Sequence, residues 1–414
     1  MLSRLFVTNS SNNTVDILDI STPSTPTQVS RLSLDPFGAG VNSVAFKNGV
    51  LAIALEADPV TDFGSVAFFD NGGSFLNQVE VGSLPDMVTF TPDGSKVLVA
   101  NEGEPDDGVD PDGSVSIIDI SGGVGSASVT TALFTGFNGQ EDALRAQGVR
   151  IFPDATASQD LEPEYIAVSG DGSTAYVALQ EANALGVLDI IAGEFTDLVG
   201  LGLKEYTALD ASDRDDGINI QDLPVFGLYM PDAIATYEVN GETFIVTANE
   251  GDDRGDADED ERGDAIRLKD LEDVTSFGRD GVELDPSIDE ALLEDEVLGR
   301  LTVSSLDGDI DGDGDIDQIV AYGGRSFSIW KEDGTRVYDS GDDFEQITAQ
   351  LVPEIFNSNG DPDSFDSRSD NKGPEPEGVT VGQFGGRTLA FIGLERVGGV
   401  MVYDPLGSKG DPRQ

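Results

Sequence analysis

The chain has 414 residues, of which 79 are acidic and 23 basic, and its formal net charge is −56. A surface this acidic repels phosphate backbones and anionic bilayers, so nucleic acid and direct membrane insertion are poor expectations and divalent cations are good ones. The absence of cysteine and histidine excludes disulfides, thiolate nucleophiles, Ser-His-Asp triads and the usual zinc ligand sets.

The beginning of the chain predicts a strand. No stretch is long and apolar enough to span a bilayer, and residues 1–4 lead into a strand pattern rather than a signal peptide. We therefore expect a domain of a longer protein that is secreted or held at the cell surface, with its signal or anchor segment outside this sequence.

Further along, the strands follow a repeated unit. A proline followed by an acid begins a short apolar strand, and a second strand ends in a glutamate. The first strands lie at 85–90, 163–168, 231–235 and 376–381, and the second strands at 97–102, 176–181, 244–250 and 389–395. A third strand of the pattern Gly-x-Val-x-apolar-apolar-Asp usually follows, and Pro-Asp-Gly or Gly-Asp-Gly turns indicate tight antiparallel hairpins.

Three or four strands per repeat with little helix predict an all-β fold, a seven-bladed β-propeller forming one domain. The blades are expected near 1–35, 36–80, 81–135, 155–200, 228–275, 300–345 and 370–410. The first blade is visible only from its second strand, so either one strand was lost or the two ends close the ring together. Six or eight blades remain alternatives.

Two insertions interrupt the strands, near 136–150 and 252–298. The first predicts a short helix at 141–145, and the second predicts another helix from 285 to 298. Between 252 and 270 the chain is so acidic and glycine-rich that it either needs a cation for order or forms a mobile loop.

The repeated acids predict a ring of carboxylates. In a propeller the innermost strand lines the central channel, and the loops before it and after the next strand open on one face. The acids at these places are Asp86, Glu102, Glu164, Glu181, Asp232, Glu250, Glu377 and Glu395. Crowded like charges are costly unless some are protonated or a cation neutralises them, so we predict a divalent metal at the channel mouth. Alternatively, these acids cap turns and pair with basic residues of neighbouring blades.

A second candidate metal site is a local motif of alternating acids. Its members are Asp307, Asp309, Asp311, Asp313, Asp315 and Asp317. Alternating carboxylates with glycine at the turn match the first half of an EF-hand-like loop in either of two registers, which predicts structural Ca²⁺. The twelfth position would be Gln318 or Val320, so the loop is not a complete EF-hand, and a plain acidic turn is the alternative. Residues 211–217 form another acidic loop, which could bind a cation or substrate or be a β-turn.

Basic residues near the carboxylates are candidates for holding a phosphoryl group. Arg254, Arg325 and Arg396 lie close in sequence to the repeated acids. A metal flanked by arginines can stabilise a phosphoryl group without histidine, so these three residues and Glu250 form the predicted catalytic set. Each arginine can equally well neutralise its acidic neighbours.

Several motifs together resemble the choice-of-anchor I family. They lie at 209–215, 229–234, 248–252, 325–330 and 373–378, and the resemblance covers nearly the whole chain. The family consists of bacterial exported propeller proteins, common in cyanobacteria and marine bacteria and often joined to a variable anchoring segment. The resemblance implies that fold, and it implies that Glu102, Glu164, Glu250 and Glu377 could hold metal as in calcium-dependent phosphatase propellers.

Two functions follow as expectations. Some family members are described as atypical alkaline phosphatases, which implies a calcium-dependent phosphoesterase that uses a metal-bound water on a small phosphate ester, with a second divalent metal as an option. Most members have no demonstrated activity, and the type that also uses iron and a cysteine cannot apply to this chain. The alternative is a noncatalytic cell-surface or assembly module, in which calcium stiffens loops and the blades bind protein or glycan.

Overall fold

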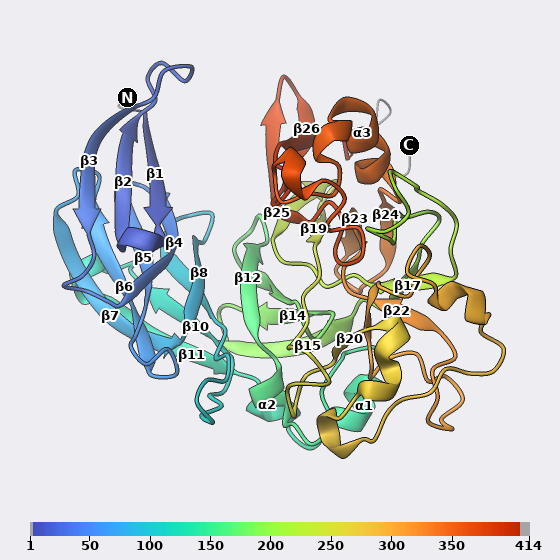
Figure 1. The fold of residues 1–414 in the computed structure, drawn as a ribbon. Helices are drawn as coiled ribbons and strands as arrows, with labels where there is room; N and C mark the ends of the chain where they lie inside the picture. The colour runs from blue at the N-terminus through green and yellow to red at the C-terminus, as the bar shows by residue number, and fades with distance from the viewer. Residues whose placement is uncertain (1–2, 406–414) are drawn as a thin grey trace. The chain divides into compact units, whose positions relative to one another are not determined.

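The computed structural model describes residues 3–405, which form seven sheets and a few short helices (Figure 1). This confirms the predicted all-β class. The sheets lie in two compact units, Met1–Gln147 with Asp154–Val199 and Gly148–Pro153 with Gly200–Gln414. Within residues 3–405, no helix has both the length and the apolar character needed to cross a membrane.

The first unit contains four sheets whose strands pair in chain order. The first has three strands, β1 (Arg4–Asn9), β2 (Thr14–Asp19) and β3 (Thr27–Ser33). The second comprises β4 (Gly40–Lys47), β5 (Val50–Glu56), β6 (Phe63–Asp70) and β7 (Phe75–Ser83). The third comprises β8 (Pro85–Phe90), β9 (Lys96–Asn101), β10 (Ser114–Asp119) and β11 (Ser128–Leu133). The fourth comprises β12 (Pro163–Val168), β13 (Thr174–Leu179), β14 (Ala184–Asp189) and β15 (Glu194–Gly200).

Period-two alternation and tight turns produce these sheets. Between the second and third sheets, side chains such as Val66, Phe68 and Val99 are fully buried and form a shared core. The turn between β8 and β9 is stabilised by Asp93, whose Oδ1 accepts hydrogen bonds from Thr91 Oγ1 and the Ser95 amide. Gly94 in the same turn has φ +74°, a conformation that glycine adopts without steric cost.

The second unit contains three sheets. A five-stranded sheet has the order β16 (Leu203–Glu205), β17 (Val225–Leu228), β22 (Ile319–Ala321), β21 (Thr302–Ser304) and β20 (Ala265–Arg267). The next joins β18 (Ile234–Val239), β19 (Glu242–Asn249), β23 (Ser326–Lys331) and β24 (Arg336–Asp339). The last has three strands, β25 (Pro376–Phe384), β26 (Arg387–Leu394) and β27 (Val400–Tyr403).

Helices connect these sheets. The α-helices are α1 (Glu141–Arg145), α2 (Ala157–Asp160) and α3 (Asp343–Leu351). The 3₁₀ turns are η1 (Ser10–Asn12), η2 (Val124–Ser126), η3 (Thr135–Phe137), η4 (Leu268–Asp273), η5 (Ser276–Gly278), η6 (Glu290–Leu293), η7 (Pro353–Ile355) and η8 (Pro362–Ser364). The predicted helix at 141–145 is confirmed.

The helix predicted from 285 to 298 is wrong, because only the single turn of η6 forms there. The backbone leaves the helical region at Glu294, with ψ 144°, and the Leu298 amide returns to donate to the Leu292 carbonyl. Leu298 is fully buried, and Leu292, Leu293 and Val297 pack against the same core. Burial of so many neighbouring apolar side chains favours a folded-back loop over a helix, which would point some of them to solvent.

The expected blades near 228–275 and 300–345 are interleaved in the structure. β19 pairs with β23 over Phe244↔Lys331 to Asn249↔Ser326, so one sheet draws on both ranges. Strands β20, β21 and β22 join a different sheet, where β17 and β22 run parallel. Hydrophobic patterning does not specify such pairing, because it identifies strands without naming their neighbours.

Candidate functional site

The repeated acids occupy equivalent places at strand ends. Glu102, Glu181, Glu250 and Glu395 each follow a second strand, namely β9, β13, β19 and β26. Glu56 ends β5 at the same position, but the sequence analysis missed it because no proline–acid pair begins β4, the first strand of that hairpin.

The acids on the first strands lie at irregularities of the ladder. Asp86 lies where the β8–β9 register shifts between Pro85 and Met87, and Glu164 lies where the β12–β13 register shifts between Pro163 and Tyr165. Glu377 lies within the corresponding shift of the β25–β26 pair. A bulge re-aims a side chain and leaves its residue outside the regular pairing, which sets these acids apart from the strand faces.

A left-handed residue before the proline fixes three of these strand ends. Leu84, Met230 and Glu375 have φ of 45°, 45° and 48°, an uncommon conformation for residues other than glycine. The carbonyl of Leu84 accepts a hydrogen bond from the Glu102 amide, and the carbonyl of Glu375 accepts one from the Glu395 amide. The carbonyl of Met230 accepts the amide of Gly251, next to Glu250. The backbone therefore holds the repeated glutamates in a reproducible position.

In the first unit, Glu102 lies among other carboxylates. Burial raises its pKa well above the ordinary value, and the charges of Glu181, Asp86, Glu104 and Glu162 raise it further. Glu162 and Glu181 are themselves buried, with exposed fractions of 4% and 8%. A site of this kind favours either a protonated glutamic acid or a bound cation.

In the second unit, the oxygens of Glu250, Glu375 and Glu395 lie within 4.8 Å of one another. Basic side chains accompany them. Lys372 Nζ donates to Glu250 Oε1 at 3.1 Å, and the fully buried Glu375 accepts from Arg368 Nε at 2.5 Å and from Arg396 Nε at 3.1 Å. Arg396 also pairs with Glu395 at 2.8 Å. This cluster therefore carries its own counter-charges.

The pKa values in the second unit reflect both burial and these charges. Burial raises the pKa of Glu250 to about 7, although Lys372 lowers it. Burial also raises the pKa of Glu377, and the negative charge of Glu395 adds to that rise. For Lys372 burial acts in the opposite direction, but the carboxylates of Glu250 and Asp252 outweigh it and raise its pKa.

The three arginines predicted to hold a phosphoryl group lie in different surroundings. Arg396 contacts one of the repeated acids, since its Nε lies 2.8 Å from Glu395 Oε2. Arg325 is 3% exposed, and its guanidinium donates to Glu345 Oε1 and to the carbonyls of Asp210, Ser369 and Asn371. Arg254 lies with its guanidinium carbon 4.6 Å from the centre of the Phe152 ring, and its amide donates to Asp264. The fourth acid expected at this face of the unit, Asp232, donates its amide to the Ala248 carbonyl at 3.2 Å.

The acidic loop after β21 brings carboxylates together in two groups that share one residue. Asp309, Asp311 and Asp317 form the first group, and Asp285, Asp315 and Asp317 form the second, each with oxygens within 4.8 Å. The amide of Asp285 donates to the Ile316 carbonyl at 3.0 Å, which places this distant residue beside the loop. Sequence reasoning missed Asp285 because the pairing of Leu284 with Ile316 is not local.

Electrostatics within this loop favour a cation. Burial and the charges of Asp313 and Asp285 raise the pKa of Asp315 to about 6, and Asp313 raises the pKa of Asp311. Asp313 itself lies in neither group. Asp307, predicted to be a ligand, instead accepts from Arg150 Nε at 2.8 Å and from Ser304 Oγ at 2.6 Å. Its carboxylate thus serves to hold the start of the loop.

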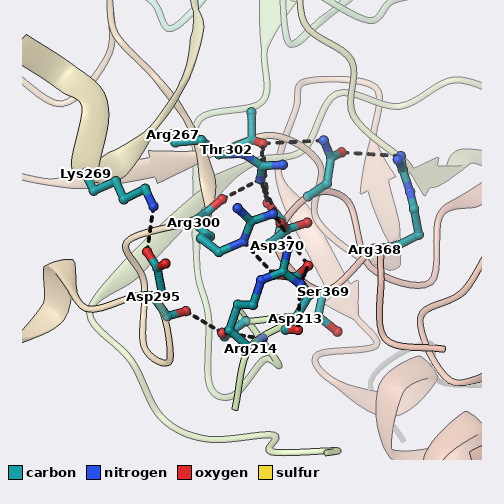
Figure 2. Close-up of polar contacts among 12 residues, drawn as sticks. Asp213, Arg214, Arg267, Lys269, Asp295, Arg300, Thr302, Arg368, Ser369 and Asp370 are labelled. Carbon is teal, nitrogen blue, oxygen red and sulfur yellow. Dashed lines mark hydrogen bonds and ion pairs between the residues drawn. The ribbon is translucent and has the colours of Figure 1, made fainter. Parts of the chain in front are cut away.

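The acidic loop at 211–217 is part of an ion-pair network (Figure 2). Asp213 pairs with Arg300 at 2.7 Å and with Arg214, and Arg300 also pairs with Asp370 at 2.8 Å. Arg267 joins the network through Asp370 at 3.1 Å. The arginines of this network neutralise Asp213 and Asp370, and the network holds four chain segments together.

The geometry defines a class of protein: an all-β repeat protein that presents acids at equivalent strand ends. The chain belongs to the choice-of-anchor I family, whose domain profile matches residues 2–406. Membership of this family indicates a surface or exported protein.

Two curated proteins are similar to this chain. One is the "Mesenchyme-specific cell surface glycoprotein" of Strongylocentrotus purpuratus, 30% identical over 290 residues, which are 62% of this chain and 36% of the relative. The other is "Gigasin-3a" of Magallana gigas, 40% identical over 119 residues, which are 27% of this chain and 42% of the relative. The matched region is less than half the length of either relative.

Solved structures show weaker likeness. Hydrazine synthase of Kuenenia stuttgartiensis has a TM-score of 0.37 at 15% identity, over 59% of this chain and 64% of that one. The computationally designed Ika8 protein has a TM-score of 0.39 at 11% identity, over 98% of this chain and 82% of that one. Likeness at this level carries no information about function.

Proposed function

We propose that this chain is a calcium-binding surface module, in which the seven sheets are the blades of a propeller and calcium stiffens the loop at 309–317. In this proposal the exported protein acts by binding a surface protein or glycan. The repeated glutamates of the second unit have a structural role.

The observation that carries the proposal is the shared position of Asp317 between two groups of acids. The carboxylates of Asp285, Asp309, Asp311 and Asp315 lie around that of Asp317, and within residues 3–405 none of these five acids pairs with a basic side chain. Asp315 Oδ1 is buried and accepts no hydrogen bond. Oxygen-only ligand sets of this kind suit Ca²⁺, which takes six to eight oxygens in flexible geometry.

The ion pairs of the second unit argue against a catalytic metal at the glutamates of that unit. Lys372, Arg368 and Arg396 already neutralise Glu250, Glu375 and Glu395 at distances of 2.5–3.1 Å. A divalent ion would have to displace these cations or bear their repulsion. The name of the sea-urchin relative, a cell surface glycoprotein, supports a role at a surface without a chemical step.

A metal-dependent phosphoesterase is the second candidate, and Glu102 supports it. Burial raises the pKa of Glu102, and the charges of four nearby carboxylates raise it further. A divalent cation held there would lower the pKa of a bound water and supply a nucleophile without histidine. Arg325 is a poor candidate for holding the phosphate in this reaction, because its guanidinium already donates to acceptors inside the protein.

Calcium titration by calorimetry, after chelator treatment, tests the first candidate. We expect wild-type protein to bind Ca²⁺, the Asp317→Asn variant to lose that binding, and Asp333→Asn, in the turn before β24, to retain it. Equal binding by the Asp317→Asn variant would reject the loop as the site.

Hydrolysis of a generic phosphomonoester and phosphodiester, measured in parallel, tests the second candidate. Activity that Ca²⁺ restores after chelator treatment, and that the Glu102→Gln substitution abolishes, would establish a metal-dependent phosphoesterase.

A further inference from the structure

A cavity of about 390 Å³ lies on the first unit, beside the second sheet. Its walls include Phe37, Glu56, Phe63, Ser65, Gln78 and Glu80. It is formed within one unit, by the loop before β4 and by the strands β5, β6 and β7, which lie side by side in Figure 1. Its volume is within the range of small-ligand sites.

The register of the sheet places its polar and aromatic lining on one face. Ser65 lies opposite Glu80, and Ala67 lies opposite Gln78, in the β6–β7 pair. The ladder shifts register between Phe63 and Ser65, so Phe63 stands at the irregular end of β6. Side chains two positions apart on a strand share a face, which brings Phe63 and Ser65 together.

The floor of the cavity is held rigidly. The Phe37 ring stacks on Phe75 at 5.0 Å and packs edge-on against Phe69 at 5.3 Å. Gln78 Nε2 donates to the Phe37 carbonyl at 2.6 Å and to Ser65 Oγ at 2.7 Å. A binding surface that is already ordered loses little conformational entropy when a ligand binds.

Glycines at positions 38 and 40 make room for the end of β5. A Cβ at Gly40 would collide with the carboxylate of Glu56, and a Cβ at Gly38 would lie 2.7 Å from Leu55 Cβ. The Glu56 carboxylate therefore lies close to the backbone of Gly40, and Asn42 Nδ2 donates to its Oε2 at 3.5 Å.

The lining combines negative charge with exposed aromatic surface. Within residues 3–405 neither Glu56 nor Glu80 forms an ion pair, and Phe63 is 67% exposed. A large exposed phenyl ring beside two carboxylates is suited to an organic cation, which gains both ion pairing and cation–π attraction. The net charge of −56 further favours a positively charged partner.

We propose that this cavity binds an arginine side chain of a partner polypeptide. A guanidinium is planar, so it can stack on a phenyl face while its fork of donors meets a carboxylate, and it is more weakly hydrated than an ammonium group. A lysine lacks this geometry. The cavity thus adds a specific contact to a surface module and does not depend on calcium.

Ligand-observed NMR titration with N-acetyl-arginine amide tests the proposal, with N-acetyl-citrulline amide as the uncharged isostere. We expect citrulline to bind at least tenfold more weakly, and the Phe63→Ala and Glu80→Gln variants each to bind the arginine probe roughly fivefold more weakly. Matched controls are Phe384→Ala and Glu194→Gln, which change an exposed phenylalanine and an exposed glutamate elsewhere. Both should bind as wild type does.

Several results would overturn the proposal. Equal binding of citrulline would show that charge is not recognised, and equal weakening by the control variants would show that the probe binds the acidic surface without a site. Binding of N-acetyl-lysine amide as tight as that of the arginine probe would reject the guanidinium assignment. Because Phe63 and Glu80 are exposed, thermal unfolding of their variants should match wild type, which separates lost binding from lost folding.

Discussion

Replacing Glu375 with glutamine distinguishes a structural ion-pair cluster from a metal centre. The Glu375 side chain has no exposed surface, whereas its partners Arg368 and Arg396 are 21% and 42% exposed. Removing one partner of a buried pair costs about 3–5 kcal/mol, and an exposed pair contributes about 0–1 kcal/mol. Because both arginines reach water and glutamine keeps one acceptor oxygen, we expect Glu375→Gln to cost about 2 kcal/mol.

Thermal unfolding measures this cost. A loss of about 2 kcal/mol corresponds to a fall in Tm of about 4–8 °C for a unit of this size. The fall should be the same in excess chelator and in millimolar Ca²⁺, since the cluster supplies its own cations. Glu354→Gln, an exposed glutamate in η7, is the matched control and should leave Tm unchanged.

Two outcomes contradict this reasoning. A fall in Tm that appears only when Ca²⁺ is present would show that Glu375 stabilises the protein through a bound ion. A fall of less than about 1 °C in both conditions would show that the pairs with Arg368 and Arg396 contribute nothing measurable.

Three further predictions follow from other sites. Asp285→Asn should weaken Ca²⁺ binding roughly tenfold, because Asp285 completes one of the two acidic groups. An unchanged affinity in calorimetry would show that Asp285 is not a ligand. Burial raises the pKa of Glu250 from its usual 4.5 to about 7, so folding favours its protonated form. This preference stabilises the folded protein by about 3 kcal/mol below pH 4.5, and the stabilisation is lost as the pH rises through 7. The Glu250→Gln variant should therefore show a flatter dependence of unfolding free energy on pH between 4.5 and 7, and a wild-type slope would exclude the shift. Arg325→Met should lower stability by about 3 kcal/mol or more, because it leaves the buried Glu345 without its arginine, and chemical denaturation would refute this if the midpoint were unchanged.

The local features of this protein could be predicted from its sequence. Alternating β-branched runs and Asp-Gly turns specify strands and hairpins through contacts between near neighbours, so β8, β9, β12 and β13 lie where the repeat predicts. The short helix α1 was predicted for the same reason. The repeated glutamates also follow from the sequence, because a strand end is a local property.

The partners of those glutamates were decided by tertiary structure. Lys372, the partner of Glu250, lies 122 residues away in the chain, and no spacing rule links the two. The same holds for Asp285, which reaches the acidic loop through a bridge between Leu284 and Ile316. A long-range contact gains its energy only once the intervening chain is folded, so the residues alone do not reveal it.

Tertiary structure also decided which acids have other tasks. Asp307 belongs to the alternating motif, yet Arg150 and Ser304 hold its carboxylate. Arg325 follows the pattern of a phosphate-binding residue, yet burial directs all its observed hydrogen bonds to the interior. The sequence by itself determined the strands, the turns and the positions of charge. The fold decided which charges neutralise one another, because a buried ion needs a partner and only three-dimensional packing supplies it.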